Sequence, residues 1–532
     1  MKKYPFYKTA YYDTFGQMLR SLSQKYGDKP AITSYALDAG SSVYSYAELY
    51  EDVLLAAAAL QKRGLTKKHI AVVGNNSYEW LVAFFASEIS GNIPVLIDIE
   101  QPNDTVESML AFADTEFVFI SADMKPIVDA GENTGSIPQV GLGCDSFRQF
   151  CAEAEYGEYK EVSPGGKIIV YTSGTTAEPK AVILGAQGIV RNAADSIAMV
   201  QGTKKVYTAL PFYHVYGLTC GIIANLIAGA GIGINGDLKT MFRDFRMFDA
   251  GTMMAVPLIA EQLTRMLLQA AKSRPGVLEE HPKKTFFRSK KRVKPTPEAL
   301  ELKQEVCGSL ELIICGGAPL LPHVAQVLMQ FGIQVLQGYG ITECSPLVSV
   351  NRNMDDKFDS VGMLLPGCKV RISGDGEVLI SSNSLMAGYY KQEELTKEAV
   401  SDGWFHSGDI GMIDKQGYLS ISGRLKNVIV MKNGKKVLPE EIEGYLKAIP
   451  LIKSAVVYGA ETGIETDDVK IAASVFLDPQ QSADLAPYEA LAELQSYIDT
   501  LNKKLPFYKQ IQIVNIREEE AGRTALGKEK RS

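Results

Sequence analysis

Hydrophobic and polar residues follow two alternating periods along the first part of the chain. Residues 44–64 (YSYAELYEDVLLAAAALQKRG) carry apolar side chains at helical spacing and end at Gly64, which predicts an amphipathic helix. Residues 67–76 (KKHIAVVGNN) and 92–99 (NIPVLIDI) are short apolar runs typical of buried strands, and residues 77–91 between them predict a capped helix. This strand–helix–strand order predicts a parallel sheet with helices on its faces.

The same rhythm returns further along the chain and then changes. Residues 207–236 and 251–336 repeat it, so we expect an α/β fold with a large N-terminal domain of helix-flanked sheets over residues 1–423. Short strands and turns after residue 360 predict a β-rich subdomain at about 360–423. Residues 424–532 predict a small α+β C-terminal domain, made of a strand pair, a helix, two more strands and a helix.

One apolar run is long enough to be tested as a membrane span. Residues 217–234 (GLTCGIIANLIAGAGIGI) comprise 18 residues, the lower limit for a spanning helix. The run contains five glycines and Asn225, and its second half alternates. We therefore predict a buried helix of about three turns that leads into a buried strand, and no transmembrane segment.

Composition narrows the class of protein. The 532 residues are 46% hydrophobic and 22% charged, which is typical of a globular protein with two or more domains. The formal net charge of -7 removes the electrostatic basis for broad nucleic-acid binding. The seven cysteines form no CxxC pair and the N-terminus lacks the apolar run of a signal peptide, so we expect reduced thiols and a cytoplasmic location.

The densest set of small polar residues follows a buried run. Residues 171–180 (YTSGTTAEPK) come directly after KIIV, so the segment leaves a predicted strand. Backbone N–H groups and hydroxyls in such a segment can surround phosphate oxygens, and a lysine adds positive charge. The residues expected to contact phosphate are Thr172, Ser173, Gly174, Thr175, Thr176 and Lys180. Taken alone, the segment fits an ordinary polar turn equally well.

Two further turns follow predicted strands. Residues 316–319 (GGAP) follow LELIIC, and in residues 335–346 (VLQGYGITECSP) a strand is expected to leave into the turn GYG. Loops at the carboxyl ends of parallel strands are where open α/β sheets bind ligands. Tyr339, Thr342 and Glu343 offer an aromatic ring, a hydroxyl and a carboxylate, which can stack a base, bond a phosphate and hold magnesium.

Six segments in this order resemble the adenylate-forming superfamily of acyl-CoA synthetases, peptide-synthetase adenylation domains and luciferases. They are YTSGTTAEPK (171–180), GGAP (316–319), YGITE (339–343), WFHSGD (404–409), GRLK (423–426) and TALGK (524–528). The resemblance extends from residue 44 to Lys528, and GRLKNVIVMKNGKKVLPEEIE is similar to bacterial long-chain acyl-CoA synthetases.

The resemblance implies an enzyme that uses ATP and Mg²⁺ to join a carboxylic acid to AMP, and then transfers the acyl group to coenzyme A. A fatty or other hydrophobic acid is favoured, although the apolar segments 212–234 and 251–268 fit a pocket and a protein core equally well. Two alternatives stay open. One is transfer to the phosphopantetheine of a carrier protein, and the other is a catalytically silent protein that binds acyl groups or nucleotides.

The resemblance also implies where ATP is held. The segment from Thr172 to Lys180 would hold the β- and γ-phosphates. Tyr339 would pack on adenine, near Gly317 and Ala318.

Further residues are implied to act on the α-phosphate, the metal and the ribose. Thr342 would contact the α-phosphate, and Glu343 would ligate magnesium. Asp409 matches the acid that accepts from both ribose hydroxyls, with Arg424 beside it. Lys528 matches the catalytic lysine, which meets the substrate carboxylate and the α-phosphate as charge builds.

A hinge is implied at Lys426. Rotation there would make the C-terminal domain mobile, remove Lys528 from the site, and bring Lys432 and Gly434 toward the thiol.

Three further positions concern the acyl pocket and the phosphate segment. His214 lies in the segment LPFYHVYGL, and a lone histidine among apolar residues is more often a core residue than a catalyst. The resemblance instead favours a place for His214 in the acyl pocket. It implies the same place for Gly338. Ala177 stands where the family usually has glycine. If that position needs a positive φ, the methyl group costs about 1 kcal/mol, and we expect reduced freedom of the segment rather than inactivity.

Overall fold

The computed structural model divides into two compact units, each described by itself. The residues described are 5–36, 40–131, 134–172, 180–235, 237–274, 277, 294–353, 357–461, 469–483 and 485–520. The first unit takes in the described residues up to Lys369 together with Ser381–Phe405; the second takes in Val370–Ile380 and the described residues from His406 onward. The predicted start of the C-terminal domain, Arg424, lies inside the second unit. That domain boundary, and the hinge expected beside it at Lys426, stay predictions.

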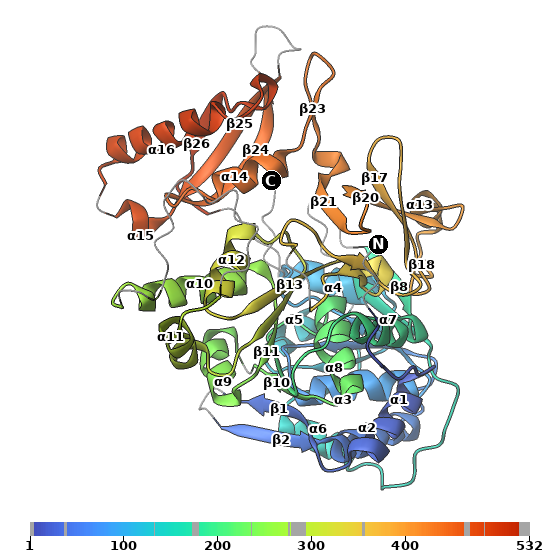
Figure 1. Cartoon of the computed structure of the whole chain (residues 1–532). Helices are drawn as coiled ribbons and strands as arrows, with labels where there is room; N and C mark the ends of the chain where they lie inside the picture. The colour runs from blue at the N-terminus through green and yellow to red at the C-terminus, as the bar shows by residue number, and fades with distance from the viewer. Residues whose placement is uncertain are drawn as a thin grey trace. The chain divides into compact units, whose positions relative to one another are not determined.

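The first unit contains a seven-stranded sheet of order β18-β8-β7-β4-β3-β5-β6. Two of its strands, β8 and β18, are labelled in Figure 1. Its strands are β3 (His69–Val73), β4 (Ile93–Leu96), β5 (Phe117–Ile120), β6 (Gln139–Gly141), β7 (Lys167–Tyr171), β8 (Ala181–Gly185) and β18 (Gly388–Tyr389). The strands from β7 to β6 are parallel, whereas β8 and β18 are antiparallel. The predicted strands at 67–76 and 92–99 are β3 and β4, and their parallel pairing is confirmed.

A nine-stranded sheet completes the first unit, with the order β15-β14-β13-β12-β11-β9-β10-β1-β2. Its strands are β1 (Pro30–Tyr35), β2 (Ser41–Ser45), β9 (Lys205–Thr208), β10 (Gly231–Ile234), β11 (Thr252–Ala255), β12 (Leu312–Cys315), β13 (Gln334–Gly340), β14 (Leu347–Val350) and β15 (Met363–Leu364). The six strands from β13 to β1 are parallel, as the repeated rhythm at 207–236 and 251–336 predicted.

Helices flank both sheets. They are α1 (Phe15–Tyr26), α2 (Tyr46–Lys62), α3 (Tyr78–Ile89), α4 (Asn103–Phe112), α5 (Lys125–Ala130), α6 (Cys144–Cys151), α7 (Ala186–Met199), α8 (Ala224–Ala228), α9 (Met241–Phe248), α10 (Pro257–Ala271), α11 (Pro297–Cys307), α12 (Pro322–Gln330) and α13 (Glu393–Ala399). The predicted helix 44–64 begins at Tyr46 rather than Tyr44, because Tyr44 pairs with Ile32 in the sheet and Ser45 forms a capping box with Glu48.

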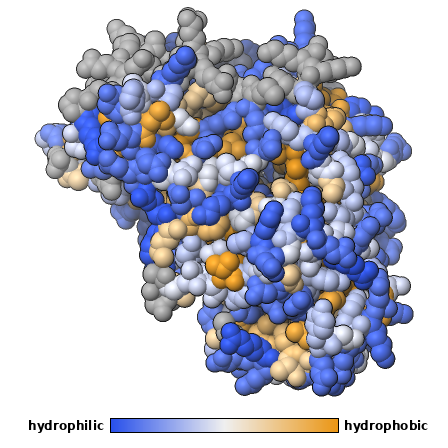
Figure 2. All heavy atoms as spheres, turned by 60° about the horizontal axis from the view of Figure 1, so that its bottom comes forward, coloured by the Kyte–Doolittle hydropathy of each residue, from blue (hydrophilic) through white to orange (hydrophobic). Residues whose placement is uncertain are grey.

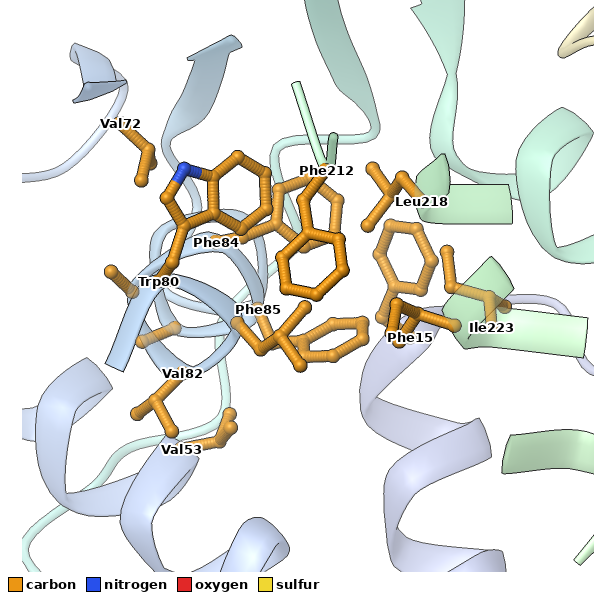
Figure 3. Close-up of a cluster of buried hydrophobic side chains, with 14 of the residues drawn as sticks. Phe15, Val53, Val72, Trp80, Val82, Phe84, Phe85, Phe212, Leu218 and Ile223 are labelled. Carbon is orange, nitrogen blue, oxygen red and sulfur yellow. The ribbon is translucent and has the colours of Figure 1, made fainter. Parts of the chain in front are cut away.

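An aromatic cluster lies where α1, α3 and the segment after β9 meet (Figure 3). Phe15 of α1 makes edge contacts with Phe84 and Phe85 of α3, with ring centroids 5.5 Å apart in both cases. Trp80 packs against Phe212, 5.6 Å away. These side chains are fully buried, so they hold the segment after β9 against α3.

The apolar run 217–234 forms a buried helix that leads into strand β10, as predicted. Its first part is a π-helix, η1 (Tyr216–Ile223), which continues into α8. The side chain of Asn225 donates to the carbonyls of Cys220 and Gly221 at 2.9 Å, so this polar amide has partners inside the apolar helix. Among the residues that the structure describes, none of the helices has both the length and the apolar character to cross a membrane.

The C-terminal third is rich in short strands, as predicted. A five-stranded sheet has the order β16-β17-β20-β19, with β21 paired to β20. A pair β22-β23 and a three-stranded sheet β24-β25-β26 follow. The strands are β16 (Lys369–Ile372), β17 (Glu377–Ser381), β19 (Val400–Ser401), β20 (Trp404–Ile413), β21 (Leu419–Arg424), β22 (Ile429–Val430), β23 (Lys436–Val437), β24 (Ile452–Glu461), β25 (Val469–Leu477) and β26 (Ile513–Ile516). The helices α14 (Pro439–Leu446), α15 (Pro479–Ser482) and α16 (Pro487–Asn502) complete the α+β part.

The surface is mainly polar on the face that Figure 2 shows. Hydrophilic residues cover most of that face, and hydrophobic residues lie in small, separate patches. Six cysteines with described side chains are free thiols, four of them buried.

Candidate active site

Asn76 ties together the ends of strands from the two large sheets. It follows β3, and its side chain donates to the carbonyl of Leu210 at 2.9 Å and accepts from the backbone N–H of Phe212 at 3.0 Å. Leu210 and Phe212 follow β9 of the other sheet. The carboxyl ends of parallel strands from both sheets therefore lie together, which is where α/β proteins bind ligands.

His214 and Asp98 meet at the same junction. His214 Nε2 lies 4.0 Å from Asp98 Oδ2, and both residues are buried. Burial lowers the pKa of His214 even though the Asp98 carboxylate opposes that shift, so the imidazole is neutral at pH 7. His214 Nε2 has no hydrogen-bond partner among the described residues, which leaves a buried polar atom that a ligand group can satisfy.

The expected turn after β13 begins later than predicted. Gly338, Tyr339 and Gly340 belong to β13 and pair with Val350, Ser349 and Leu347 of β14, so the prediction that the strand leaves into GYG was wrong. The antiparallel partner extends the strand, which sequence periodicity does not reveal. The turn itself is η3 (Thr342–Cys344), which presents Thr342 and Glu343 directly after the strand.

The side chain of Asn192, on α7, hydrogen-bonds to the backbone at this turn. Its buried side chain donates to the carbonyls of Cys344 at 3.2 Å and Leu347 at 2.8 Å, and it accepts from the Leu347 N–H at 3.1 Å. Asn192 therefore satisfies backbone groups on both sides of the turn that carries Glu343, and Ser384 Oγ is a second donor to the Cys344 carbonyl at 2.9 Å. No motif in the sequence marked Asn192.

Glu343 is also fixed by the segment around β18. The Tyr389 hydroxyl donates to Glu343 Oε1 at 2.8 Å, and the N–H of Met386 donates to the Glu343 carbonyl at 2.7 Å. Burial, with the nearby Glu343 carboxylate, raises the pKa of Tyr389, so its hydroxyl stays protonated. Tyr389 is a second residue that the sequence did not single out.

Thr172 and Lys180 are the described ends of the expected phosphate segment. The Thr172 N–H donates to the Lys180 carbonyl at 3.0 Å, so β7 and β8 are joined by a closed hairpin. Lys180 Nζ lies 5.1 Å from the centre of the Tyr389 ring. The positions between them, residues 173–179, lie outside the described residues; they include Ser173, Gly174, Thr175, Thr176 and Ala177.

The GGAP turn follows β12 and packs against the π-helix. Gly317 has φ +85°, a conformation that favours glycine. A Cβ at Gly316 would lie 3.1 Å from the Tyr216 ring, and the Tyr216 hydroxyl donates to the carbonyl of Ile314 at 3.0 Å. A side chain at Gly316 would therefore have to displace the Tyr216 ring slightly, while Ala318 is half-buried in the same turn.

Asp409 and Arg424 lie in the second unit. They face each other on β20 and β21, and Arg424 Nε is 2.8 Å from Asp409 Oδ1. Glu377 holds the residues that precede Asp409 on β20. It accepts from the Gly408 N–H at 2.8 Å and contacts His406 Nδ1 at 3.0 Å. The sequence did not identify Glu377 as part of this arrangement.

The expected hinge and thiol-side residues follow β21. Lys426 lies in the short helix η4 (Leu425–Asn427), where Asn427 donates to Glu440 of α14 at 2.6 Å. Lys432 and Gly434 lie on the exposed turn between β22 and β23, and Gly434 has φ +74°. Lys528 lies outside the described residues.

The carboxylate of Glu343 fits a magnesium ion held jointly with a nucleotide. The described part of the chain contains no group of three or more His, Cys, Asp or Glu residues that could hold a metal alone. Magnesium is commonly bound through one or two carboxylates, with water and substrate phosphates as the other ligands. Glu343 therefore suits a shared site rather than an all-protein cage.

Comparison with known families identifies the class. Residues 19–390 match the AMP-binding enzyme family, and residues 426–528 match the AMP-binding enzyme C-terminal domain. The chain belongs to the AMP-binding enzyme family, as the six segments predicted.

Individual relatives point the same way. The chain is 27% identical over 472 residues to "Long-chain-fatty-acid--CoA ligase FadD15" of Mycobacterium bovis, covering 82% of this chain and 77% of that protein. It is 27% identical over 510 residues to "Long chain acyl-CoA synthetase 4" of Arabidopsis thaliana, covering 84% and 76%. Its fold matches the anthranilate CoA ligase AuaEII in complex with anthranoyl-AMP, with a TM-score of 0.80, 18% identity, and coverage of 98% and 96%.

Proposed function

We propose that this protein is an AMP-forming acid–thiol ligase. A carboxylate oxygen of the substrate attacks the α-phosphorus of ATP, the bond to the β-phosphate breaks, and pyrophosphate leaves. The sulfur of coenzyme A then attacks the acyl carbon, and AMP leaves. The protein contributes no nucleophile, so it acts by positioning reactants and neutralising charge.

One observation carries this proposal in the structure. Lys180, from the β7–β8 hairpin, and Glu343, from the turn after β13, both contact Tyr389. An ammonium group suited to phosphate and a carboxylate suited to magnesium are thus gathered at one place, in a chain of the AMP-binding enzyme family.

We assign the nucleotide site to the residues that the resemblance selected. Thr172–Thr176 and Lys180 take the β- and γ-phosphates, and Thr342 takes the α-phosphate. Gly317, Ala318 and Tyr339 surround the adenine, a placement supported by the left-handed turn at Gly317. The buried carboxylate of Asp409 binds the ribose, and Arg424 holds that carboxylate in place. Lys528 neutralises the charge that builds during adenylation.

The substrate is proposed to be a fatty or other hydrophobic acid. The names of the M. bovis and A. thaliana relatives support a long-chain acid. His214 lines the acyl pocket in this proposal, supported by its unpartnered Nε2, and Gly338 is assigned to the same pocket.

The transfer step requires the C-terminal domain, residues 424–532, to rotate at Lys426. The match to the family's C-terminal domain begins at residue 426, which supports this position. Lys432 and Gly434 then face the thiol. We place the enzyme in the cytoplasm, since its described cysteines are free thiols.

A pyrophosphate-release assay tests the proposal. Acids of graded length and aromaticity are supplied with ATP and Mg²⁺, and the reactions are repeated with coenzyme A or with a carrier protein. We expect acid-dependent pyrophosphate release and acyl-CoA formation, and loss of release in Lys528→Ala. Thioester formed only on the carrier protein would instead indicate the phosphopantetheine alternative, and no release with any acid would indicate a silent binding protein.

A further inference from the structure

Tyr389 connects two residues that the proposed function assigns to the nucleotide. Its hydroxyl donates to Glu343 Oε1 at 2.8 Å, and its ring lies 5.1 Å from Lys180 Nζ. Tyr389 belongs to β18, Glu343 belongs to η3, and Lys180 directly precedes β8, so the three residues are far apart in sequence. One side chain therefore contacts both the candidate metal ligand and the candidate phosphate lysine.

The backbone holds the Tyr389 ring in place. Gly388 and Tyr389 pair with Ile183 and Val182 of β8, and the Tyr389 N–H donates to Thr396 Oγ1 at 2.9 Å. The side chain is only 6% exposed. Because β8 follows Lys180 directly, the strand that fixes Tyr389 also fixes the lysine.

We propose that Tyr389 is a positioning residue that sets the carboxylate of Glu343 and the ammonium group of Lys180 for the polyphosphate of ATP; this inference rests on the proposed function. The hydroxyl occupies one oxygen of Glu343 and thereby fixes the rotation of the carboxylate, which directs its remaining lone pairs to a metal. The ring face attracts the lysine ammonium and limits its range. Tyr389 needs no contact with substrate to do this.

Tyr389→Phe separates the two contacts, because it removes the hydroxyl and keeps the ring. The matched control is Tyr390→Phe: Tyr390 is the next residue, and its hydroxyl donates to Asp114 at 2.7 Å, away from Glu343. Tyr389→Leu removes the ring as well. Thermal unfolding without nucleotide checks that each variant is folded, and Tyr389→Phe decides the outcome if Tyr389→Leu does not fold.

The first readout is binding rather than activity. Mn²⁺ is titrated into the protein with a non-hydrolysable ATP analogue and followed by electron paramagnetic resonance. We expect Tyr389→Phe to weaken Mn²⁺ binding about tenfold, as loss of a hydrogen bond to a charged group implies, and Tyr390→Phe to leave it unchanged. Tyr389→Leu is expected to weaken binding of the analogue in the absence of metal as well.

The second readout is the metal dependence of pyrophosphate release. The Mg²⁺ concentration for half-maximal rate should rise about tenfold in Tyr389→Phe, while KM for the acid stays within about twofold. Equal Mn²⁺ binding by Tyr389→Phe, Tyr390→Phe and the unchanged protein would overturn the inference. Failure of the unchanged protein to release pyrophosphate with any acid would instead count against the proposed function, and the Mn²⁺ titration distinguishes the two cases.

Discussion

Arg424 and Asp409 face each other on neighbouring antiparallel strands, with Arg424 Nε 2.8 Å from Asp409 Oδ1. The Asp409 side chain is only 6% exposed, while that of Arg424 is 35% exposed. The guanidinium group therefore orients the carboxylate without burying both charges. An oriented carboxylate can accept from two neighbouring hydroxyl groups, as a ribose presents them.

Replacing this carboxylate should weaken nucleotide binding. Asp409→Asn keeps the shape but puts an N–H₂ group where an acceptor is needed, so we expect KM for ATP to rise about tenfold or more. Steady-state kinetics with varied ATP measures this change. Asp402→Asn, at an exposed turn position, is the control and should leave KM unchanged. Similar KM values for both variants would contradict the ribose assignment.

The buried Glu88 should make stability depend on pH. Burial raises the pKa of Glu88 from its ordinary value of 4.5 to about 7, although the N–H of Gly166 donates to Oε1 at 3.1 Å. The native state therefore binds the proton more tightly than the unfolded state. The resulting stabilisation is complete below pH 4.5 and is lost as pH rises through about 7.

Glu88→Gln should remove this dependence. Above pH 7 the variant should have a free energy of unfolding higher than that of the unchanged protein by up to about 3 kcal/mol, and near pH 4.5 the two should be similar. Urea unfolding at several pH values measures the difference. Glu51→Gln, at an exposed position of α2, is the control. A constant difference across the pH range would show that Glu88 does not titrate as stated.

Asn192 should be required for the turn that carries Glu343. Asn192→Ala leaves the carbonyl and the N–H of Leu347 without their side-chain partner and removes one of the two side-chain donors to the Cys344 carbonyl, so we expect a loss of about 3 kcal/mol in unfolding free energy. The rate of pyrophosphate release should fall as well, because Glu343 loses its fixed position. Thermal unfolding and the release assay measure the two effects. Ser196→Ala, one turn along α7, removes a bond to the Asn192 carbonyl and a side-chain contact with Cys220; because it leaves the Asn192 side chain in place, it should cost much less.

Restricting the predicted hinge should separate the two half-reactions. Lys426→Pro fixes a backbone angle in η4, so we expect acyl-AMP to form at a normal rate while thioester formation falls at least about tenfold. Lys426→Ala removes the side chain without restricting the backbone, and it should retain both steps. Single-turnover assays with and without coenzyme A distinguish the steps. Equal loss of both in Lys426→Pro would argue against a hinge there.

Much of the fold could be predicted from local pattern. The strands around Ile70 and Val95 and the helix capped by Ser77 follow from alternation of apolar residues and from capping chemistry. The later start of the helix at Tyr46 and the extension of β13 through Gly340 were not predictable in this way. Both depend on pairing with another strand, and that pairing overrides local periodicity.

The residues of the candidate site also differ in whether the sequence alone could identify them. Lys180 and Glu343 could be selected from the sequence because each lies in a short polar segment that follows a predicted strand, and Asp409 could be selected because its segment resembles the family. Tyr389 and Asn192 could not, since each acts through a residue that is distant in the chain; Tyr389 is 46 positions from Glu343, and Asn192 is 152 positions from Cys344.

The sequence by itself determined the order of the strands and helices, the family, and the residue types that ATP chemistry requires. Only the tertiary structure decided which side chains hold those residues, and it alone set His214 beside Asp98 at the junction of two sheets. The physical reason is that periodicity and capping act over a few residues, whereas hydrogen bonds between buried groups depend on how whole sheets and helices pack.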